Sequence, residues 1–417
     1  MEELLFLSHR IPYPPNKGDK VRSFNILKNL ARRYRIHLGA FVDQPEDWER
    51  AEELKEWCET VFLLPLRPRR DRVLSLRGLL TGEALTLPYY RSRRMSDWVE
   101  EMTKGGNLRR CFVFSSSMAQ YVENAPGMRR VIDFCDVDSA KWMEYAQRRD
   151  GITSWIYRRE GQKLLQYETR ITMRCEVVTL VADHERKVFE SLSPAVTGRV
   201  KVVNNGVDRG FFCPDSSLAD PFAGGKAIVF TGAMDYWPNI DAVSWFAHDV
   251  WPLVRSRHPD LRFYIVGMNP SPPVKALEDI DGVVVTGSVP DVRPYLQHAR
   301  LVVAPLRVAR GIQNKILEAM AMDKQVVAHA QCAAPLVDAD RYGLRQADTA
   351  HEFAEAVLER LDKETRNDLG TPRDYVSRFY DWATNVEGVE AMLEGAPNDR
   401  GASTRQGLAD AFVGARN

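Results

Sequence analysis

The sequence of 417 residues is poor in features that would mark out several classes of protein. Its six cysteines are scattered, and no two of them have the spacing of metal ligands or of a redox pair. Such isolated thiols are typical of proteins from a reducing cytosol. Basic and acidic residues are equal in number, at 57 each, so no overall field attracts the chain to nucleic acid.

Long apolar runs and targeting signals are also lacking. No stretch is apolar over the length that a bilayer requires, and the N-terminus lacks the basic region and apolar core of a signal peptide. The sequence has no His-Glu-x-x-His motif and no cluster of His, Cys and Asp, so a metal-independent reaction is expected. A hydrophobic content of 44% and a charged content of 27% are typical of a soluble globular protein long enough for two domains.

Short apolar runs and helical periods alternate along the whole chain. Strands of the first half are predicted at Leu4–Ser8, Ile36–Val42, Val61–Leu64, Cys111–Phe114, Val131–Ile132, Val177–Val181 and Val200–Val203. Helices are predicted at 20–33, 47–58, 138–149, 155–175 and 183–192, with a basic and partly helical stretch at 67–107. In the second half, strands are predicted at 227–231, 263–266, 283–286, 301–304 and 326–328, again with helices between them. This alternation predicts an α/β protein with parallel sheets and right-handed crossovers.

A turn-rich segment at 205–225 interrupts the alternation, which then restarts. We therefore predict a first domain at 1–204, a linker at 205–225 and a second domain at 226–371. Two helices at 372–394 are predicted to pack back toward the first domain, and 395–417 is predicted to be a loose tail. Two Rossmann-like, doubly wound sheets facing each other across a cleft would bind ligands at their carboxyl ends.

The most informative stretch runs from Ala304 to Met322. It is predicted to be a strand end, a loop at Gly311 and a helix on which Lys315 and Glu318 share a face. A glycine loop leading to a helix N-terminus is suited to an anion. A cation followed by a carboxylate one turn later suits a nucleoside diphosphate, with phosphate at the first and sugar hydroxyls at the second. The alternative is an ordinary strand–helix unit with a solvated face.

A series of motifs, each weak alone, occurs in a specific order over both halves. Together they resemble the retaining GT-B glycosyltransferases of family 4, and most of all the bacterial subgroup found with exopolysaccharide and exosortase (PEP-CTERM) gene clusters. The motifs are Pro12 to Arg22, Asp133 to Ser139, Asn205 to Asp208, Thr231 to Asn239, Val289 to Tyr295 and Leu317 to Ala321.

The resemblance implies a retaining hexosyltransferase of the Leloir type. It would move a sugar from a nucleoside diphosphate sugar to a saccharide or lipid-linked saccharide acceptor, in the synthesis of exopolysaccharide or cell-surface glycan. The nucleotide sugar would be a substrate, and no cofactor or metal is expected. Two alternatives stay open: a non-catalytic protein that binds a nucleotide sugar or acts as a scaffold, and a GT-B nucleotide-sugar epimerase.

The resemblance also implies roles for particular residues. Glu318 fits the second of the family's two glutamates separated by seven residues, and is expected to bind the ribose. Pro290 and Asp291 would lie over the base, although Asp291 also suits a helix cap. The expected donor-binding residues are Gly18, Arg22, Gly232, Pro290, Asp291, Gly311, Ile312, Gln313, Asn314 and Glu318, and the expected catalytic residues are Arg310, Lys315 and Asp136.

The sequence departs from the family pattern at several positions. Arg310 replaces the first glutamate, and the loop from Asp235 to Asn239 lacks the basic residues usual after Thr231-Gly232. We interpret this as a relocation, in which Arg310 and Lys315 supply the missing cations. Asp323 stands where a glycine commonly ends the helix, and would form a turn with some strain.

Acidic and basic side chains in the first half allow more than one interpretation. Asp19, in place of a second glycine, is either a helix cap or a catalytic group. Asp136 is favoured as an acceptor contact, whereas Asp138 suits a helix cap. Clusters at Arg67, Arg69, Arg70 and Arg72 and at Arg91, Arg93 and Arg94 are either solvated faces or contacts with anionic lipid. Cytoplasmic localisation is expected, with peripheral contact at the inner face of the membrane as an extension.

Overall fold

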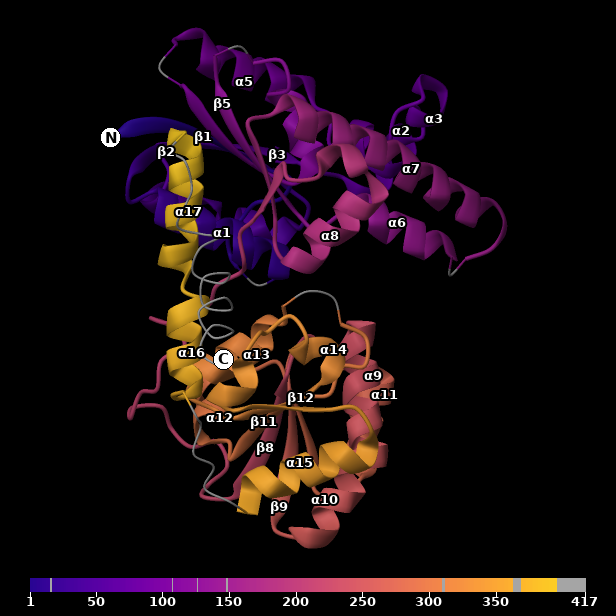
Figure 1. Ribbon diagram of the computed structural model, residues 1–417, viewed down its shortest axis with the longest axis vertical. Coiled ribbons are helices and arrows are strands. Elements are labelled where there is room, and N and C mark those ends of the chain that lie inside the picture. Colours follow the sequence, from indigo (N-terminus) through magenta and orange to yellow (C-terminus); the bar gives the residue numbers. More distant parts are fainter. Residues whose placement is uncertain are drawn as a thin grey trace, which may run out of the picture. The chain divides into compact units, whose positions relative to one another are not determined.

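The computed structural model describes residues 1–15, 17–106, 108–125, 127–147, 149–309, 312–362 and 369–395 (Figure 1). The chain forms two compact units. The first comprises residues 1–204 together with the chain from Trp382 onward, and the second comprises Asn205–Asp381. Each unit contains one parallel sheet.

The first unit is built on a seven-stranded sheet of order β3-β2-β1-β4-β5-β6-β7. The apolar run Leu4 to Leu7 lies in the central strand β1, where Leu4 and Phe6 face one hydrophobic cluster and Leu5 and Leu7 the other. A strand buried on both faces is continuously apolar, which explains why these strands were predictable. The strands are β1 (Glu2–Ser8), β2 (Tyr34–Val42), β3 (Thr60–Pro65), β4 (Arg110–Phe114), β5 (Arg129–Cys135), β6 (Val177–Leu180) and β7 (Val200–Val202).

Helices cover both faces of this sheet (Figure 1). The helices of this unit are α1 (Gly18–Leu30), α2 (Pro68–Ser75), α3 (Gly78–Thr81), α4 (Thr86–Tyr89), α5 (Arg93–Lys104), α6 (Asp138–Gln147), α7 (Gly151–Arg174), α8 (Asp183–Leu192) and α17 (Trp382–Glu394). The prediction of one α-helix at 47–58 is wrong, because two 3₁₀ segments, Pro45–Trp48 and Ala51–Glu56, occupy this stretch. Asp47 is drawn inward there by a buried ion pair with Lys20 (2.6 Å).

The second unit is built on a six-stranded sheet of order β10-β9-β8-β11-β12-β13. Its strands are β8 (Lys226–Thr231), β9 (Leu261–Val266), β10 (Val283–Gly287), β11 (Leu301–Ala304), β12 (Val326–His329) and β13 (Leu344–Ala347). Its helices are α9 (Trp237–Trp245), α10 (Trp251–Arg257), α11 (Pro272–Lys275), α12 (Arg293–His298), α13 (Asn314–Ala321), α14 (Ala330–Ala333), α15 (Ala350–Asp362) and α16 (Pro372–Phe379). A π-helical turn, Phe246–Val250, joins α9 to α10.

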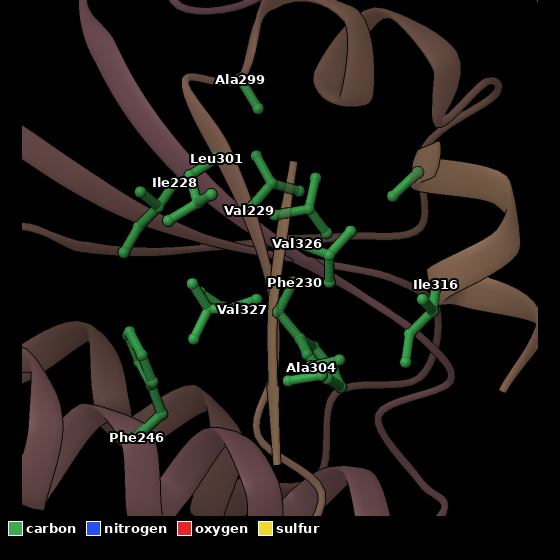
Figure 2. Packing of buried hydrophobic residues seen from close by; sticks show 14 of the residues in the cluster. Ile228, Val229, Phe230, Phe246, Ala299, Leu301, Ala304, Ile316, Val326 and Val327 are labelled. Atoms are coloured by element: carbon green, nitrogen blue, oxygen red, sulfur yellow. The ribbon is translucent and has the colours of Figure 1, made fainter. Parts of the chain in front are cut away.

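The core of this unit lies between the central strands and the flanking helices. Figure 2 shows side chains of β8, β11 and β12 packed together, with Phe246 and Ile316 contributed by the helical layers. Ile228, Phe230, Leu301 and Val327 are all fully buried. This packing fixes the carboxyl ends of β8 and β11, from which the candidate site is built.

Of the two C-terminal helices predicted to pack toward the first domain, one does and the other does not. Only α17 packs on the first unit, where Trp382, Val386 and Val389 join a core cluster. By contrast, α16 packs in the second unit, where the Tyr375 ring lies 5.2 Å from that of Tyr342 and its hydroxyl donates to the Val337 carbonyl. Apolar periodicity shows that each helix has a buried face, but not which sheet that face covers.

The predicted linker also packs within the second unit. Val207 forms an isolated parallel bridge with Asp381, and the Phe222 ring lies 4.6 Å from the Tyr264 ring. Apart from Gly395, the predicted tail lies outside the described residues.

Candidate functional site

The carboxyl ends of β8 and β11 form the topological switch point of the second sheet. β8 and β11 are neighbours, and the strands that follow each of them lie on opposite sides of this pair. Ligands of open α/β sheets bind in the crevice at such a point. The loop after β8 leads through Gly232 into α9, and the loop after β11 leads into α13.

Two glycines allow the backbone and side chains to approach closely at this point. A Cβ atom on Gly232 would lie 2.8 Å from Asn239 Nδ2 and 2.9 Å from Lys315 Nζ. A Cβ atom on Gly267, which follows β9, would lie 1.6 Å from the Gly232 carbonyl oxygen. Gly232 therefore leaves room for one side chain from α9 and one from α13 at the end of β8.

Lys315 lies in the first turn of α13 and reaches back to β8. Its ammonium donates to Asn239 Oδ1 (2.7 Å) and lies 4.0 Å from the centroid of the Phe230 ring. Among the described residues it has no carboxylate within ion-pair distance. Burial lowers the pKa of Lys315 to about 7, because desolvation opposes the charged form more than Glu318 favours it.

Glu318 follows one turn later on the same helix and is half-buried. Burial raises its pKa to about 7, against the smaller opposing effect of Lys315. Its carboxylate accepts no hydrogen bond within the part of the chain that the structure describes. Lys315 and Glu318 thus lie on one face of this helix, as the sequence predicted. Both groups are able to interact with a ligand.

The residues before α13 were also predicted to contact the donor. The helix begins at Asn314, whereas the sequence predicted a start at Ile312. Ile312 is 8% exposed and belongs to the hydrophobic core, while Gln313 occupies the N-cap position and Asn314 Oδ1 accepts from Asn205 (3.4 Å). Arg310 and Gly311 lie outside the described residues.

The loop predicted to cover the base begins at the end of β10. The Gly287 carbonyl accepts from the Gly267 amide (3.2 Å), so this loop is joined to the backbone beside Gly232. Asp291 accepts from the Arg293 amide (2.9 Å) and guanidinium (2.8 Å), which lowers the pKa of Asp291, while Pro290 is exposed. Val292 occupies the N-cap position of α12, without a side-chain cap, so the predicted capping role of Asp291 is not formed, and a contact with the base stays a prediction.

α13 is followed by the turn that the sequence predicts at Asp323. Asp323 has a φ of +59°, in the left-handed region that glycine adopts more easily. The turn predicted there is formed.

In the first unit, the side chain of Arg22 is buried in an ion pair. Its guanidinium is 1% exposed and pairs bidentately with Asp133, at 2.7 and 3.1 Å. This pair ties α1 to β5 inside the unit. Gly18 is the exposed first residue of α1, and the donor-contact predictions for Gly18 and Arg22 stay untested.

Asp19 does not cap α1. The helix begins before it, with Lys17 at the N-cap position, so Asp19 lies in the first turn. Its carboxylate contacts Arg10 (2.9 Å) and His9 (3.5 Å), and these groups lower the pKa of Asp19 well below its usual range despite partial burial. This charge arrangement also suits the positive end of the α1 dipole.

Asp136 lies after β5 and forms an ion pair. Lys141 Nζ contacts both Asp136 (2.8 Å) and Asp138 (3.1 Å), and the two carboxylates raise the pKa of Lys141 although burial opposes this. Asp138 is itself the first residue of α6. The structure thus gives Asp136 a neutralising partner, and its expected contact with an acceptor stays a prediction.

Sequence reasoning missed Asn239 as a functional residue. Asn239 ends the Thr231 to Asn239 motif, whose loop was noted for its lack of cations, yet its side chain is the partner of Lys315. No local signal identifies this contact, because the two residues are 76 positions apart.

Two further observations concern the described residues. Each helix in the described ranges is too short or too polar to cross a lipid bilayer. Within the same ranges, no group of three or more His, Cys, Asp or Glu side chains is arranged to hold a metal ion. The six cysteines are free.

Comparison with known proteins places this geometry in a class. Residues 225–363, which contain the switch point, match the family model of group 1 glycosyl transferases. The two parallel-sheet units have the GT-B fold of several solved glycosyltransferase structures. No curated protein sequence matches the chain.

Three of the similar structures illustrate the range of the fold. Sucrose-phosphate synthase from Thermosynechococcus elongatus has a TM-score of 0.66 and 15% identity, covering 94% of this chain and 99% of that one. HepE of Anabaena, in complex with UDP-glucose, has a TM-score of 0.64 and 14% identity, with coverages of 94% and 99%. WaaG, a glycosyltransferase of lipopolysaccharide biosynthesis, has a TM-score of 0.59 and 15% identity, with coverages of 94% and 100%.

Proposed function

We propose that the protein is a retaining glycosyltransferase that uses a nucleoside diphosphate sugar as donor. The observation that carries this proposal is the cluster at the β8–β11 switch point, where Lys315 and Glu318 lie on one face of α13 within the region that matches the family model. HepE, a structural neighbour, is described with UDP-glucose bound, which supports a donor of this class.

The proposed chemistry assigns one role to each charged group. Lys315, with the N-terminus of α13, stabilises the diphosphate as it leaves and its negative charge grows. Glu318 accepts hydrogen bonds from the ribose hydroxyls. The bond from the sugar's anomeric carbon to the diphosphate breaks, a bond to the acceptor oxygen forms on the same face, and the acceptor proton passes to the leaving diphosphate. No enzymic nucleophile and no metal is part of this proposal.

Two finer elements rest on the sequence resemblance. Arg310 is proposed as a second cation for the diphosphate, since a guanidinium can hold phosphate bidentately. The acceptor is proposed to be a saccharide or lipid-linked saccharide in exopolysaccharide or cell-surface glycan synthesis, and the likeness to WaaG supports an acceptor of this kind.

An assay of purified protein with labelled UDP-, GDP- and dTDP-sugars and glycolipid extracts tests the function. Transfer of the sugar to an acceptor is the expected result. Donor binding without transfer or hydrolysis would favour the non-catalytic alternative, and an epimerised nucleotide sugar would favour the epimerase.

The Glu318→Ala variant tests the donor site. Because the ribose hydroxyls would lose a charged acceptor, donor binding should weaken by about 1–3 kcal/mol, with the fold retained. Calorimetric titration with the preferred nucleotide sugar measures this loss. Glu355→Ala, which alters an exposed glutamate of α15, is the matched control. Equal affinity of the parent and Glu318→Ala would remove Glu318 from the site.

We also propose that α2, the turn after it and α3 contact an anionic membrane. Arg69, Arg70, Arg72 and Arg77 are exposed beside apolar side chains that are also exposed: Val73, Leu74, Leu76 and Leu80, the last at 92%. An exposed mixture of arginine and aliphatic side chains suits an anionic bilayer surface. The second basic cluster contributes less, because Arg91 is held by Glu83 (2.7 Å) and Arg93 faces Asp97 (3.9 Å).

Charge reversal at Arg69, Arg70 and Arg72 should abolish most vesicle binding. Each cation near an anionic surface contributes about 1 kcal/mol, and salt screens the effect. Co-sedimentation with vesicles containing phosphatidylglycerol measures it, with Arg199→Glu, an exposed arginine elsewhere in the first unit, as control. Equal sedimentation with neutral vesicles would rule out this contact.

A further inference from the structure

Asn239 has a buried side chain in which one polar atom donates a hydrogen bond and the other accepts one. It is 5% exposed, its Nδ2 donates to the Ala233 carbonyl (2.8 Å), and its Oδ1 accepts from Lys315 Nζ (2.7 Å). A carbonyl requires a donor and an ammonium requires an acceptor, so the primary amide satisfies both. An aspartate would place an acceptor against the carbonyl, and an aliphatic residue would leave both groups unpaired.

The groups around Lys315 are neutral, with one exception. β8 contributes the Phe230 ring, α9 contributes Asn239, and α14 contributes Cys332, whose thiol donates to the Leu306 carbonyl. Burial raises the pKa of Cys332 to about 12, so this thiol is uncharged at neutral pH. The remaining described group is Glu318 on the same helix, which is not within ion-pair distance.

The described surroundings of Lys315 therefore hold its ammonium in place without an anion within ion-pair distance. A fully buried lysine is normally paired with a carboxylate, as Lys20, which is 1% exposed, is with Asp47 in the first unit (2.6 Å). Lys315 has a neutral amide in that place. An amide holds the ammonium in position without cancelling its charge, which leaves that charge for a ligand.

We propose that Asn239 is a positioning residue of the donor site, which holds Lys315 at the switch point in a form that gains its proton as the diphosphate sugar binds. This inference rests on the proposed function, and it adds a residue and a proton linkage to it.

The direction in which donor affinity changes with pH follows from the pKa values of Lys315 and Glu318. The pKa of Lys315 is lowered to about 7, so its protonated fraction falls as the pH rises through 7. A diphosphate sugar keeps its negative charge over this range and binds the ammonium, so donor affinity should fall by up to about tenfold per pH unit above 7. Glu318, with a pKa raised to about 7, accepts hydroxyls more strongly when it has lost its proton, so binding should weaken below 7. The wild-type affinity should therefore peak near pH 7.

Calorimetry with single variants separates the fall in donor affinity above pH 7 (the alkaline limb) from the fall below pH 7 (the acidic limb). UDP-glucose, GDP-mannose and UDP-N-acetylglucosamine serve as probes between about pH 5.5 and 8.5. Glu318→Gln should keep only the alkaline limb, with uptake of at least half a proton at pH 7, because Lys315 also loses the charge that raises its pKa. The uptake is measured from binding enthalpies in buffers of different ionisation enthalpy. Lys315→Met should lose the alkaline limb and keep the acidic one.

Variants of Asn239 test the positioning role itself. Asn239→Ala should weaken donor binding about tenfold, since the ammonium loses its hydrogen-bond acceptor, and should move the alkaline limb to lower pH. Asn239→Asp should keep Lys315 charged, so the alkaline limb should move to higher pH while affinity falls through competition with the diphosphate. Asp241→Ala is the control, because it removes a side chain of the same helix that pairs with Arg307 instead.

The outcomes distinguish the inference from the function on which it rests. A folded Asn239→Ala protein with the parent's affinity and pH profile would overturn the positioning role. Should that variant unfold, a pH-independent affinity of Glu318→Gln above pH 7 would overturn the proton linkage. Transfer activity in the wild type combined with either result would leave the proposed function intact, whereas failure to bind any nucleotide sugar would reject both.

Discussion

Replacement of Lys315 by methionine is expected to lower the rate of sugar transfer by about a hundredfold or more, because a cation that meets the growing charge of the leaving group acts mainly in the transition state. The same variant should be as stable as the parent, or more stable. The half-buried ammonium is poorly solvated and has no carboxylate partner among the described residues. Methionine has a similar length and suffers no desolvation penalty.

The stability of this variant should also depend differently on pH. The pKa of Lys315 is lowered from 10.5 to about 7 in the folded protein, so the unfolded chain binds more protons between these values. Stability therefore rises with pH across this window in the parent, and this contribution should vanish in Lys315→Met. Urea unfolding across the window and initial transfer rates measure the two effects, with Lys275→Met, an exposed lysine of α11, as control. A variant that is destabilised yet fully active would contradict the assigned role.

Replacement of Gly267 by alanine is expected to destabilise the second unit by about 3 kcal/mol or more. The new Cβ would lie 1.6 Å from the Gly232 carbonyl oxygen, so the ends of β8 and β9 would have to separate. The same shift would move Gly232 away from Asn239 and Lys315, so donor binding should be lost as well.

Thermal unfolding and donor titration measure both consequences. Gly105→Ala is the matched control, since Gly105 has a φ of −72° and a Cβ atom added there would meet no other part of the chain within 4 Å. If Gly267→Ala melts at the parent's temperature, the close approach of β8 and β9 is not as tight as the structure has it.

The parts of the fold that follow from local patterns were predictable. β1 and β8 are apolar runs buried on both faces, and their strands follow from sequence alone. β13 was missed because Arg345 and Gln346 are exposed and only the flanking residues of this edge strand are buried. The 47–58 segment has a helical period, but it forms two 3₁₀ segments, the first of which contains Asp47, the partner of Lys20.

The candidate site shows the same division between local and distant information. The spacing of Lys315 and Glu318 places them on one face of a helix whatever the rest of the chain does. Arg22, predicted from the sequence to contact the donor, pairs in the structure with Asp133, which is 111 positions away. Asn239 likewise meets Lys315 only when folding brings α9 beside α13.

A crystal structure of the protein with a bound nucleoside diphosphate sugar would test the central claim most directly. We expect the diphosphate within hydrogen-bonding distance of Lys315 Nζ, with that ammonium still held by Asn239, and the ribose hydroxyls on the Glu318 carboxylate. A nucleotide bound away from the carboxyl ends of β8 and β11, or one that contacts neither Lys315 nor Glu318, would contradict it.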